Sequence, residues 1–327
     1  MTRPLYGAVD LGGTKVLSLV ATGQGQVLAE DVRPTLAGDG PETVLRQIEG
    51  SLRAALAGAG LTPRDLNGVG IASPGPLDLA QGVVVNPPNL PGWGEFPLRR
   101  LMEERLGLPV TLENDATAAA IGEHAFGAGK GVRDMVFVTV GTGIGGGIIC
   151  GGRPYRGKGG AAGELGHMVV LADGPPCGCG NRGCVEALAS GTAIARRAQE
   201  LLAAGKAPGL ARLLSAGEAP TAEAVHRAAL AGDEDCRELL AEAGRYLGIG
   251  LASYANVLDP ELLVLGGGVL RAGEMLLGPA REALWTLALP QVRRGLRLER
   301  AVLGPRAGAL GMVAVLGQPA DYAWEGP

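Results

Sequence analysis

The amino-acid sequence predicts an α/β protein of two domains, because one strand-turn-strand design occurs in it twice. The first copy has apolar runs at Tyr6–Val9 and Val16–Ala21, which a glycine turn separates. The second copy, MVFVTVGTGIGGGIICGGRPYRG, again reads as a strand, a glycine turn and a strand. Such repetition indicates a duplicated structural unit. A chain of 327 residues with 46% hydrophobic content is long enough for two cores.

Helical and strand-like segments follow each copy. Apolar spacing predicts a helix from Glu42 to Leu56, and short apolar runs predict strands at Gly68–Ala72 and Leu262–Leu265. The stretch Thr192–Asn256 is rich in Ala, Leu, Arg and Glu with helical periodicity, so we expect a helical insertion in the second domain. Two α/β domains that face a cleft are therefore expected.

Composition and charge make several classes of partner improbable. The net charge of −4 offers no broad basic field for nucleic acid, and no apolar run reaches the roughly 18 residues of a membrane span. The N-terminus lacks the features of a secretory signal. We therefore expect a cytoplasmic protein without a nucleic-acid or membrane partner. Of the five cysteines, Cys150 and Cys236 are isolated, and we expect both to be buried thiols.

The segment from Glu164 to Glu186 has the composition of a metal site. His167, Cys177, Cys179 and Cys184 supply four nitrogen or sulfur ligands within eighteen residues. Four such ligands form a closed tetrahedral zinc site, and the intervening glycines and prolines let the chain wrap the ion. Zinc would convert these thiols into structural thiolates rather than nucleophiles. Catalytic residues are therefore expected elsewhere.

The first glycine turn, DLGGTK, has the residues that a triphosphate requires. Asp10 is a carboxylate at the end of a strand, where it can orient Mg²⁺ through water. Glycine has no Cβ, so the N–H groups of Gly12 and Gly13 can face phosphate oxygens directly. Thr14 adds a hydroxyl and Lys15 a positive charge. The alternative is an ordinary glycine hairpin with a solvated Asp10.

The second glycine turn, GTGIGGG, is a weaker signal when taken alone. Its candidate phosphate-binding residues are Gly141, Thr142 and Gly143. A Rossmann motif would require a helix after the glycines. Here Ile148, Ile149 and Cys150 continue as a β-like run, which favours a hairpin.

These motifs together resemble the ROK family of repressors and sugar kinases. The family signature E-x-G-H followed by C-x-C-G-x-x-G-C-x-E is matched at Glu164, Gly166, His167, Cys177, Cys179, Gly180, Gly183, Cys184 and Glu186. The two glycine turns extend the resemblance over most of the chain. The resemblance implies a duplicated actin-like ATPase (ribonuclease H-like) fold, in which the two turns grip one nucleotide from opposite domains.

The resemblance also suggests domain boundaries. We place the first domain at residues 1–114 and the second at residues 115–306, and we expect the last helix, about Ala307 to Leu316, to return residues 307–327 to the first domain. In LGGGV, Gly267 and Gly268 are implied as neighbours of the adenine and ribose, the alternative being a plain helix-entry turn. The segment GPRAGALGM departs from the family pattern at the residues that precede Ala307 and Gly308. We therefore assign no nucleotide contact to Pro305 or Arg306.

The candidate catalytic base is Asp115. It stands where a strand meets a helix, a position at which Asp is commonly a helix cap. The family motif E-N-D-A is matched from Glu113 to Ala116, and its Asp is the catalytic base. In phosphoryl transfer, an Asp that accepts the proton of the substrate hydroxyl is the recurrent solution.

A hexose presents hydroxyls that carboxylates and amides can bind. The candidate sugar-binding residues are Gly75, Asn89, Asn114, Asp115, Glu164, His167 and Glu186. Among them, one ring nitrogen of His167 can bind zinc while the other contacts a hydroxyl. The loops SPGPLD and NPPNLPGW carry Gly75 and Asn89, and as turn chemistry alone they would need no function.

The resulting hypothesis is an ATP-dependent hexose kinase that uses Mg²⁺, with glucose as the expected acceptor and Zn²⁺ in a structural role. Kinases for fructose, N-acetylmannosamine or N-acetylglucosamine share the same apparatus and stay open as alternatives. A sugar-sensing regulator of the family would carry an N-terminal DNA-binding module, and only nine residues precede Asp10. A homodimer or homotetramer is expected from the resemblance.

Overall fold

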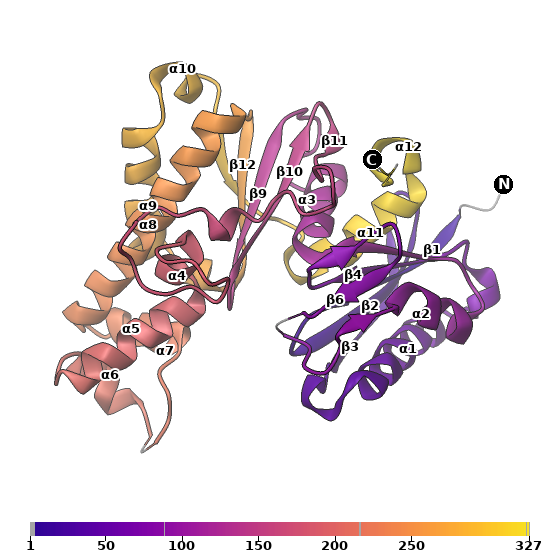
Figure 1. The fold of residues 1–327 in the computed structure, drawn as a ribbon, viewed down its shortest axis with the longest axis horizontal. Coiled ribbons are helices and arrows are strands. Elements are labelled where there is room, and N and C mark those ends of the chain that lie inside the picture. The colour runs from indigo at the N-terminus through magenta and orange to yellow at the C-terminus, as the bar shows by residue number, and fades with distance from the viewer. Residues whose placement is uncertain (1–3, 88, 216, 325, 327) are drawn as a thin grey trace. The chain divides into compact units, whose positions relative to one another are not determined.

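The computed structural model divides the chain into two compact units (Figure 1). Unit 1 comprises Met1–Met135, Gly147–Gly163 and Ala301–Pro327, and unit 2 comprises Val136–Gly146 and Glu164–Arg300. The structure describes residues 4–87, 89–215, 217–324 and 326. Within these ranges, no helix is both long and apolar enough to cross a membrane. The domain boundaries proposed from the sequence stay a prediction.

A five-stranded sheet of order β3-β2-β1-β4-β8 forms the centre of unit 1. Its strands are β1 (Leu5–Leu11), β2 (Lys15–Thr22), β3 (Val27–Pro34), β4 (Val69–Ser73) and β8 (Val110–Asn114). β1 and β2 pair antiparallel, which confirms the first predicted hairpin. β1, β4 and β8 run parallel, with Asp10 beside Ala72 and Ser73 beside Asn114. The carboxyl ends of these three strands therefore share one edge, where ligands of such sheets commonly bind.

Helices cover this sheet with apolar faces. They are α1 (Pro41–Gly58), α2 (Leu98–Leu106), α3 (Asp115–Phe126) and α11 (Ala307–Gly317). The short helix α12 (Pro319–Tyr322) contacts α11. α1 confirms the predicted helix and buries Val44, Ile48 and Leu52, which lie four residues apart on one face. α11 contacts β1, β4 and α3. Its Gly311 lies so close to α3 that a Cβ there would be 1.7 Å from the carbonyl oxygen of Ala118.

A small antiparallel sheet of order β5-β6-β7 supports the loops of unit 1. Its strands are β5 (Leu77–Asp78), β6 (Val83–Val85) and β7 (Glu95–Phe96). Trp93 is buried in the unit 1 core, with its ring centroid 4.4 Å from that of Phe96. The indole therefore anchors the loop that carries Asn89. Pro88 of the same loop lies outside the described residues.

The second five-stranded sheet has the order β11-β10-β9-β12-β13. Its strands are β9 (Met135–Val140), β10 (Ile144–Cys150), β11 (Arg153–Pro154), β12 (Leu262–Gly266) and β13 (Arg297–Arg300). β9 and β10 are neighbours joined by the second glycine turn, so the chain continues as a strand after the glycines. This result confirms the predicted hairpin and excludes the Rossmann alternative, which needs a helix there.

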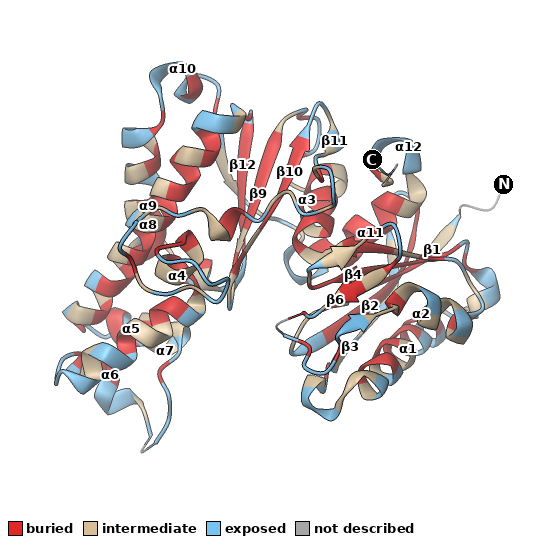
Figure 2. Ribbon diagram, in the orientation of Figure 1, coloured by how far each residue is buried: buried red, intermediate tan, exposed pale blue. Residues whose placement is uncertain are grey.

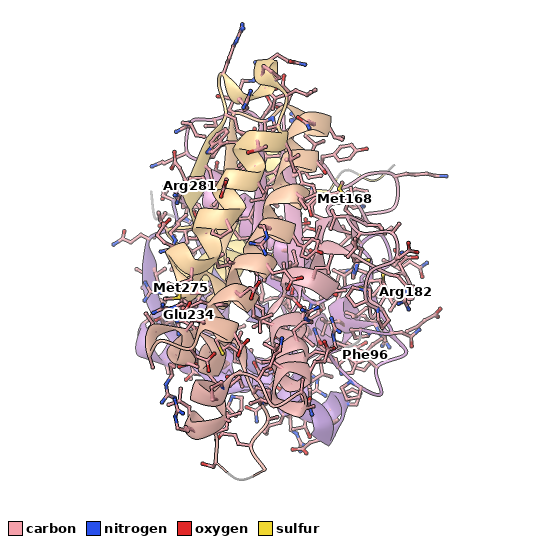
Figure 3. The ribbon with its side chains drawn as sticks, turned by 90° about the vertical axis from the view of Figure 1, so that its left-hand side faces the viewer. Phe96, Met168, Arg182, Glu234, Met275 and Arg281 are labelled. Atoms are coloured by element: carbon pink, nitrogen blue, oxygen red, sulfur yellow. The ribbon has the colours of Figure 1, made fainter. Side chains whose placement is uncertain are left out.

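The helices of unit 2 confirm the predicted helical stretch. They are α4 (Val185–Ala189), α5 (Gly191–Ala203), α6 (Pro208–Leu213), α7 (Ala222–Leu230), α8 (Glu234–Leu258), α9 (Glu274–Leu287) and α10 (Pro290–Arg293). α8 and α9 pack closely, since a Cβ on Gly248 would lie 2.2 Å from the carbonyl oxygen of Ala280. Exposed faces carry ion pairs such as that of Arg281 with Glu274 on α9. Arg281 is one of the side chains labelled in Figure 3.

Buried residues follow the central strands and the inward faces of the helices (Figure 2). Cys236 is buried in α8, as predicted. The prediction for Cys150 was wrong, because its side chain is exposed. Cys150 is the last residue of β10, and the chain turns immediately afterwards at Gly151 and Gly152. Apolar neighbours in the sequence do not show whether the last residue of a strand is buried.

Candidate active site and metal centre

The first glycine turn connects β1 to β2 at the carboxyl edge of the sheet. The Gly12 N–H donates to the Lys15 carbonyl at 2.9 Å, and the Thr35 hydroxyl donates to the Gly12 carbonyl at 2.6 Å. A Cβ on Gly13 would lie 2.9 Å from the Cβ of Asn89. The candidate phosphate turn and the candidate sugar loop of unit 1 are therefore in contact.

Asp10 lies at the end of β1, against the first turn of α11. A Cβ on Gly308 would be 2.8 Å from the carboxyl carbon of Asp10, so glycine is needed there for close approach. The pKa of Asp10 is raised to about 7, first by burial and then by the negative charge of Asp115, while Lys15 opposes the rise. The two carboxylates therefore lie close enough to repel each other. A cation with its water shell fits this arrangement.

The stability of the nucleotide-free protein is expected to fall as the pH rises from about 5 to about 8. Asp10 has a pKa of about 7 in the folded protein and 3.8 ordinarily, so between these values the folded protein binds a proton that the unfolded chain has released. This contribution is complete below the ordinary pKa and is lost as the pH rises through 7. Calorimetric Tm values should decline over this range. Asp10→Asn should flatten the decline, and an equal slope in that variant would contradict the assignment.

Asn114 and Asp115 occupy the junction of β8 and α3. Asn114 is the N-cap residue, because its side-chain oxygen accepts from the backbone N–H groups of Ala116 at 3.0 Å and Thr117 at 3.1 Å. Asp115 is the first helical residue, and its Oδ1 accepts from the Ala116 N–H at 2.8 Å. A Cβ on Gly75 would lie 3.3 Å from the side-chain nitrogen of Asn114. Gly75 thus lies beside Asn114 and Asp115, the other two candidate residues of this junction.

A buried ion pair stands directly before this junction, and no sequence motif predicts it. The Nε of Arg156 donates to the Glu113 carboxylate at 2.7 Å, and the two side chains are only 5% and 3% exposed. The guanidinium also donates to the Tyr322 carbonyl and lies 6.0 Å from the Trp324 ring centroid. Burial raises the pKa of Glu113, and Arg156 opposes the rise. The C-terminal segment is thereby connected to the strand that presents Asp115.

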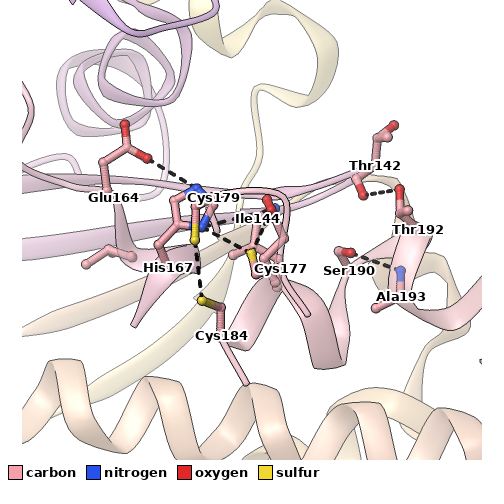
Figure 4. A network of polar contacts seen from close by, with 12 residues as sticks. Thr142, Ile144, Glu164, His167, Cys177, Cys179, Cys184, Ser190, Thr192 and Ala193 are labelled. Atoms are coloured by element: carbon pink, nitrogen blue, oxygen red, sulfur yellow. Dashed lines mark hydrogen bonds and ion pairs between the residues drawn. The ribbon is translucent and has the colours of Figure 1, made fainter. Parts of the chain in front are cut away.

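The four predicted metal ligands converge in unit 2. The ligand atoms of His167, Cys177, Cys179 and Cys184 all lie within 4.8 Å of one another (Figure 4). Cys179 Sγ is 3.7 Å from Cys184 Sγ, and Cys177 Sγ is 3.6 Å from His167 Nδ1. Tetrahedral zinc with ordinary bond lengths separates two sulfurs by about 3.8 Å and a sulfur from a nitrogen by about 3.6 Å. The residues present therefore fit zinc.

Local backbone bonds shape this cluster. The Cys177 N–H donates to the Asn181 carbonyl at 2.8 Å, and the Gly180 N–H donates to the Cys177 carbonyl at 3.0 Å. Gly183 has a φ of +67°, and a Cβ there would lie 1.6 Å from the carbonyl oxygen of Leu171. Only glycine fits that position. Short-range backbone hydrogen bonds and the glycine at position 183 therefore fold the segment that carries the three cysteines into a compact loop.

Cys179→Ser is expected to abolish stoichiometric zinc binding, because it removes one of three thiolates from a four-ligand site. Zinc content of the purified protein, measured by plasma mass spectrometry, checks this result. Cys150→Ser is the matched control, since Cys150 is exposed and stands outside the cluster. One zinc per chain in the Cys179→Ser protein would refute the ligand set.

Two carboxylates flank the imidazole of this cluster. His167 Nδ1 faces Cys177, and His167 Nε2 lies 3.9 Å from the Glu164 carboxylate. A carboxylate oxygen of Glu186 lies 4.0 Å from His167 Nδ1. Glu164 is exposed, whereas Glu186 is half-buried at the start of α4. Both predicted sugar-binding glutamates are thus adjacent to the metal ligands.

The second glycine turn lies beside the other candidate nucleotide motif. The Gly141 N–H donates to the Gly143 carbonyl at 2.9 Å, which closes the turn that exposes Thr142. Gly267 has a φ of +97°, and a Cβ there would lie 2.2 Å from the carbonyl oxygen of Val140. Gly268 follows and begins a short 3-10 helix. Unit 2 therefore brings together the glycines of both motifs.

Comparisons with known proteins agree with these geometries. The model of the ROK family matches residues 6–318. A glucokinase of Halalkalibacterium halodurans is 39% identical over 312 residues, which are 95% of this chain and 94% of that protein.

Two solved structures share the fold. A ROK hexokinase from Thermus thermophilus is 39% identical, with a TM-score of 0.78 over 95% of this chain and 97% of that one. A ROK glucokinase from Streptomyces griseus, solved in complex with glucose and AMPPNP, is 38% identical, with a TM-score of 0.79 over 95% of this chain and 98% of that one. The predicted duplicated actin-like fold is confirmed. The chain therefore belongs to the ROK family, among its sugar kinases.

Proposed function

We propose that the protein transfers the γ-phosphoryl group of ATP to the 6-hydroxyl of a hexose, and that glucose is its preferred acceptor. The observation that carries the proposal is the position of Asp115 at the carboxyl edge of the first sheet, where its charge acts on Asp10 beside the first glycine turn. A base next to a phosphate turn is the arrangement that phosphoryl transfer requires.

In the proposed reaction, the Asp115 carboxylate accepts the proton of the sugar hydroxyl. The hydroxyl oxygen then bonds to the γ-phosphorus, the bond from that phosphorus to the bridging oxygen breaks, and ADP leaves with the electron pair. Backbone N–H groups of Gly13 and Thr14 in the first turn, and of Thr142 and Gly143 in the second, are assigned to the phosphates. These fixed donors stabilise charge without reorganisation during the reaction. The N–H of Gly12, which the sequence also suggested, is instead used by the turn itself, because it donates to the Lys15 carbonyl.

Sugar recognition is assigned to side chains of both units. Asn89, Asn114 and the backbone at Gly75 form the unit 1 set, while Glu164, His167 and Glu186 form the unit 2 set. Because Asn114 uses its side-chain oxygen to cap α3, its nitrogen is the group we assign to a sugar oxygen. The glucose bound in the Streptomyces griseus relative supports the choice of hexose.

Two metal ions complete the proposal. Asp10 would hold Mg²⁺ through its water shell, and bound Mg²⁺ supplies positive charge to the triphosphate. His167 and the three clustered cysteines would hold structural Zn²⁺, which fixes the imidazole beside Glu164 and Glu186.

The remaining assignments concern the nucleotide, the location and the assembly. Gly267 and Gly268 are assigned to the adenosine. A cytoplasmic location suits thiols that must stay reduced, and the homodimeric or homotetrameric state stays a prediction.

A coupled ADP-release assay with Mg-ATP tests the proposal. Glucose, mannose, fructose, N-acetylglucosamine and N-acetylmannosamine are compared by kcat/KM, with a no-sugar reaction as control. The highest kcat/KM is expected for glucose. A higher kcat/KM for another sugar would agree with the proposed mechanism but would contradict glucose as the preferred acceptor. No turnover with any of the five sugars would contradict the proposed activity and favour a sugar sensor or another phosphoryl donor.

A further inference from the structure

We propose that the metal centre and the second glycine turn are structurally coupled, and that Glu186 is the positioning residue that links them. The inference rests on the proposed function, because it assigns phosphate binding to residues Gly141–Gly143. It adds that metal binding strengthens nucleotide binding directly, through unit 2 itself and without any sugar.

The first observation is the double engagement of the Glu186 carboxylate. Its Oε2 accepts from the backbone N–H of Ile144 at 2.8 Å, at the residue that follows the turn. Its Oε1 lies 3.8 Å from Cys177 Sγ and 4.0 Å from His167 Nδ1, which are two of the metal ligand atoms. One side chain therefore contacts the metal-ligand cluster with one oxygen and the glycine turn with the other.

The second observation is that the chain following Glu186 is bonded along the same turn (Figure 4). The Gly191 N–H donates to the Gly141 carbonyl at 2.8 Å, and the Thr192 hydroxyl donates to the Thr142 carbonyl at 2.8 Å. Gly191 and Thr192 begin α5, which follows α4 directly. Cys184, a metal ligand, is the N-cap residue of α4. The metal cluster is thus continuous with the segment that fixes the turn.

The third observation is the tightness of this contact. A Cβ on Gly143 would lie 2.4 Å from Glu186 Oε2, and a Cβ on Gly191 would lie 2.9 Å from the Gly141 carbonyl oxygen. Neither glycine has a positive φ, so the effect of a side chain at either position would come from these contacts and not from backbone conformation. At Gly143 a side chain would push the Glu186 carboxylate aside, and at Gly191 it would press on the backbone of Gly141. A contact without free space transmits small displacements, because packed interiors are poorly compressible.

These contacts predict the direction of the coupling. Metal binding fixes Cys184, and Cys184 as the N-cap residue in turn fixes the start of α4, which carries Glu186. Metal loss would let the start of α4 shift and would thereby relax the bond from Ile144 to Glu186. Nucleotide affinity should therefore be higher in the zinc-loaded protein. By linkage, the nucleotide should raise zinc affinity by the same factor, typically about 5–150-fold for coupled sites.

Calorimetric titration of the zinc-loaded protein with Mg-AMPPNP, in the absence of sugar, is the first arm of the test. The Kd is compared with that of chelator-treated protein whose circular dichroism shows that it is folded. We expect Mg-AMPPNP to bind at least about fivefold more weakly after zinc removal. Equal Kd values would overturn the inference while leaving the proposed function intact. Zinc-loaded protein that binds no Mg-AMPPNP would overturn both.

Gly143→Ala supplies the second arm, which does not depend on nucleotide binding by zinc-free protein. Its added methyl group must displace Glu186, and zinc affinity, measured by competition with a chelator, is expected to fall at least about fivefold. Gly178→Ala is the matched control, because Gly178 lies between two metal ligands and a Cβ there meets no atom within 4 Å. That control should leave both zinc and nucleotide affinity unchanged. Unaltered zinc affinity in Gly143→Ala would contradict the coupling.

Discussion

Asp115→Asn is expected to lower kcat by about 10²–10⁴-fold, the range that general base catalysis contributes. The amide oxygen can still accept from the Ala116 N–H, so α3 should begin as before. The amide cannot accept the hydroxyl proton, so the effect should fall on kcat rather than on glucose binding. Steady-state kinetics with Mg-ATP and glucose, together with calorimetric glucose binding, separate these two effects.

The matched control for Asp115→Asn is Asp39→Asn. Asp39 is exposed in the short 3-10 helix before α1 and is not among the candidate site residues. Its substitution should leave kcat and KM within about twofold of the wild-type values, since exposed positions away from special contacts are tolerant. A kcat for Asp115→Asn that equals the control value would remove Asp115 from the mechanism.

Arg156→Met is expected to reduce the free energy of unfolding by about 3–5 kcal/mol. The substitution leaves Glu113 buried without its partner and removes the donor to the Tyr322 carbonyl. A buried, uncompensated carboxylate is costly because no water replaces the lost ion pair. Urea denaturation followed by circular dichroism measures the change.

Two further variants distinguish the loss of the ion pair from the general effect on stability of removing an arginine. The exposed Arg64 gives a control variant, Arg64→Met, which should change the free energy of unfolding by no more than about 0.5 kcal/mol. The double variant Glu113→Leu with Arg156→Met should recover most of the lost stability, because it removes both charges. A loss for Arg156→Met as small as that of the control would show that the pair does not stabilise the fold.

Much of the fold could be predicted because its signals are local. Within sixteen residues, one glycine turn separates two apolar runs on either side of DLGGTK. The structure pairs these runs as β1 and β2. The spacing of Val44, Ile48 and Leu52 is enough to identify α1. The metal ligands occupy one short segment, so their convergence follows from turn chemistry in that segment alone.

The parts that could not be predicted depend on contacts between distant segments. Arg156 follows Glu113 by 43 residues and stands in a glycine-rich stretch that reads as a loop. Nothing in that stretch indicates that its guanidinium is buried and lies beside the Trp324 ring. The bond from Ile144 to Glu186 likewise joins residues 42 positions apart. Burial of a polar partner is decided by the assembled fold, which residue spacing does not encode.

The central claim, phosphoryl transfer to a hexose 6-hydroxyl, is tested most directly by identifying the product. Purified protein is incubated with Mg-ATP and glucose labelled with ¹³C at carbon 6, and the carbon spectrum is recorded with and without phosphorus decoupling. We predict that the carbon 6 signal splits by coupling to phosphorus and that ADP forms in equal amount. ATP consumption that yields only inorganic phosphate, or phosphorylation at another carbon, would contradict the account.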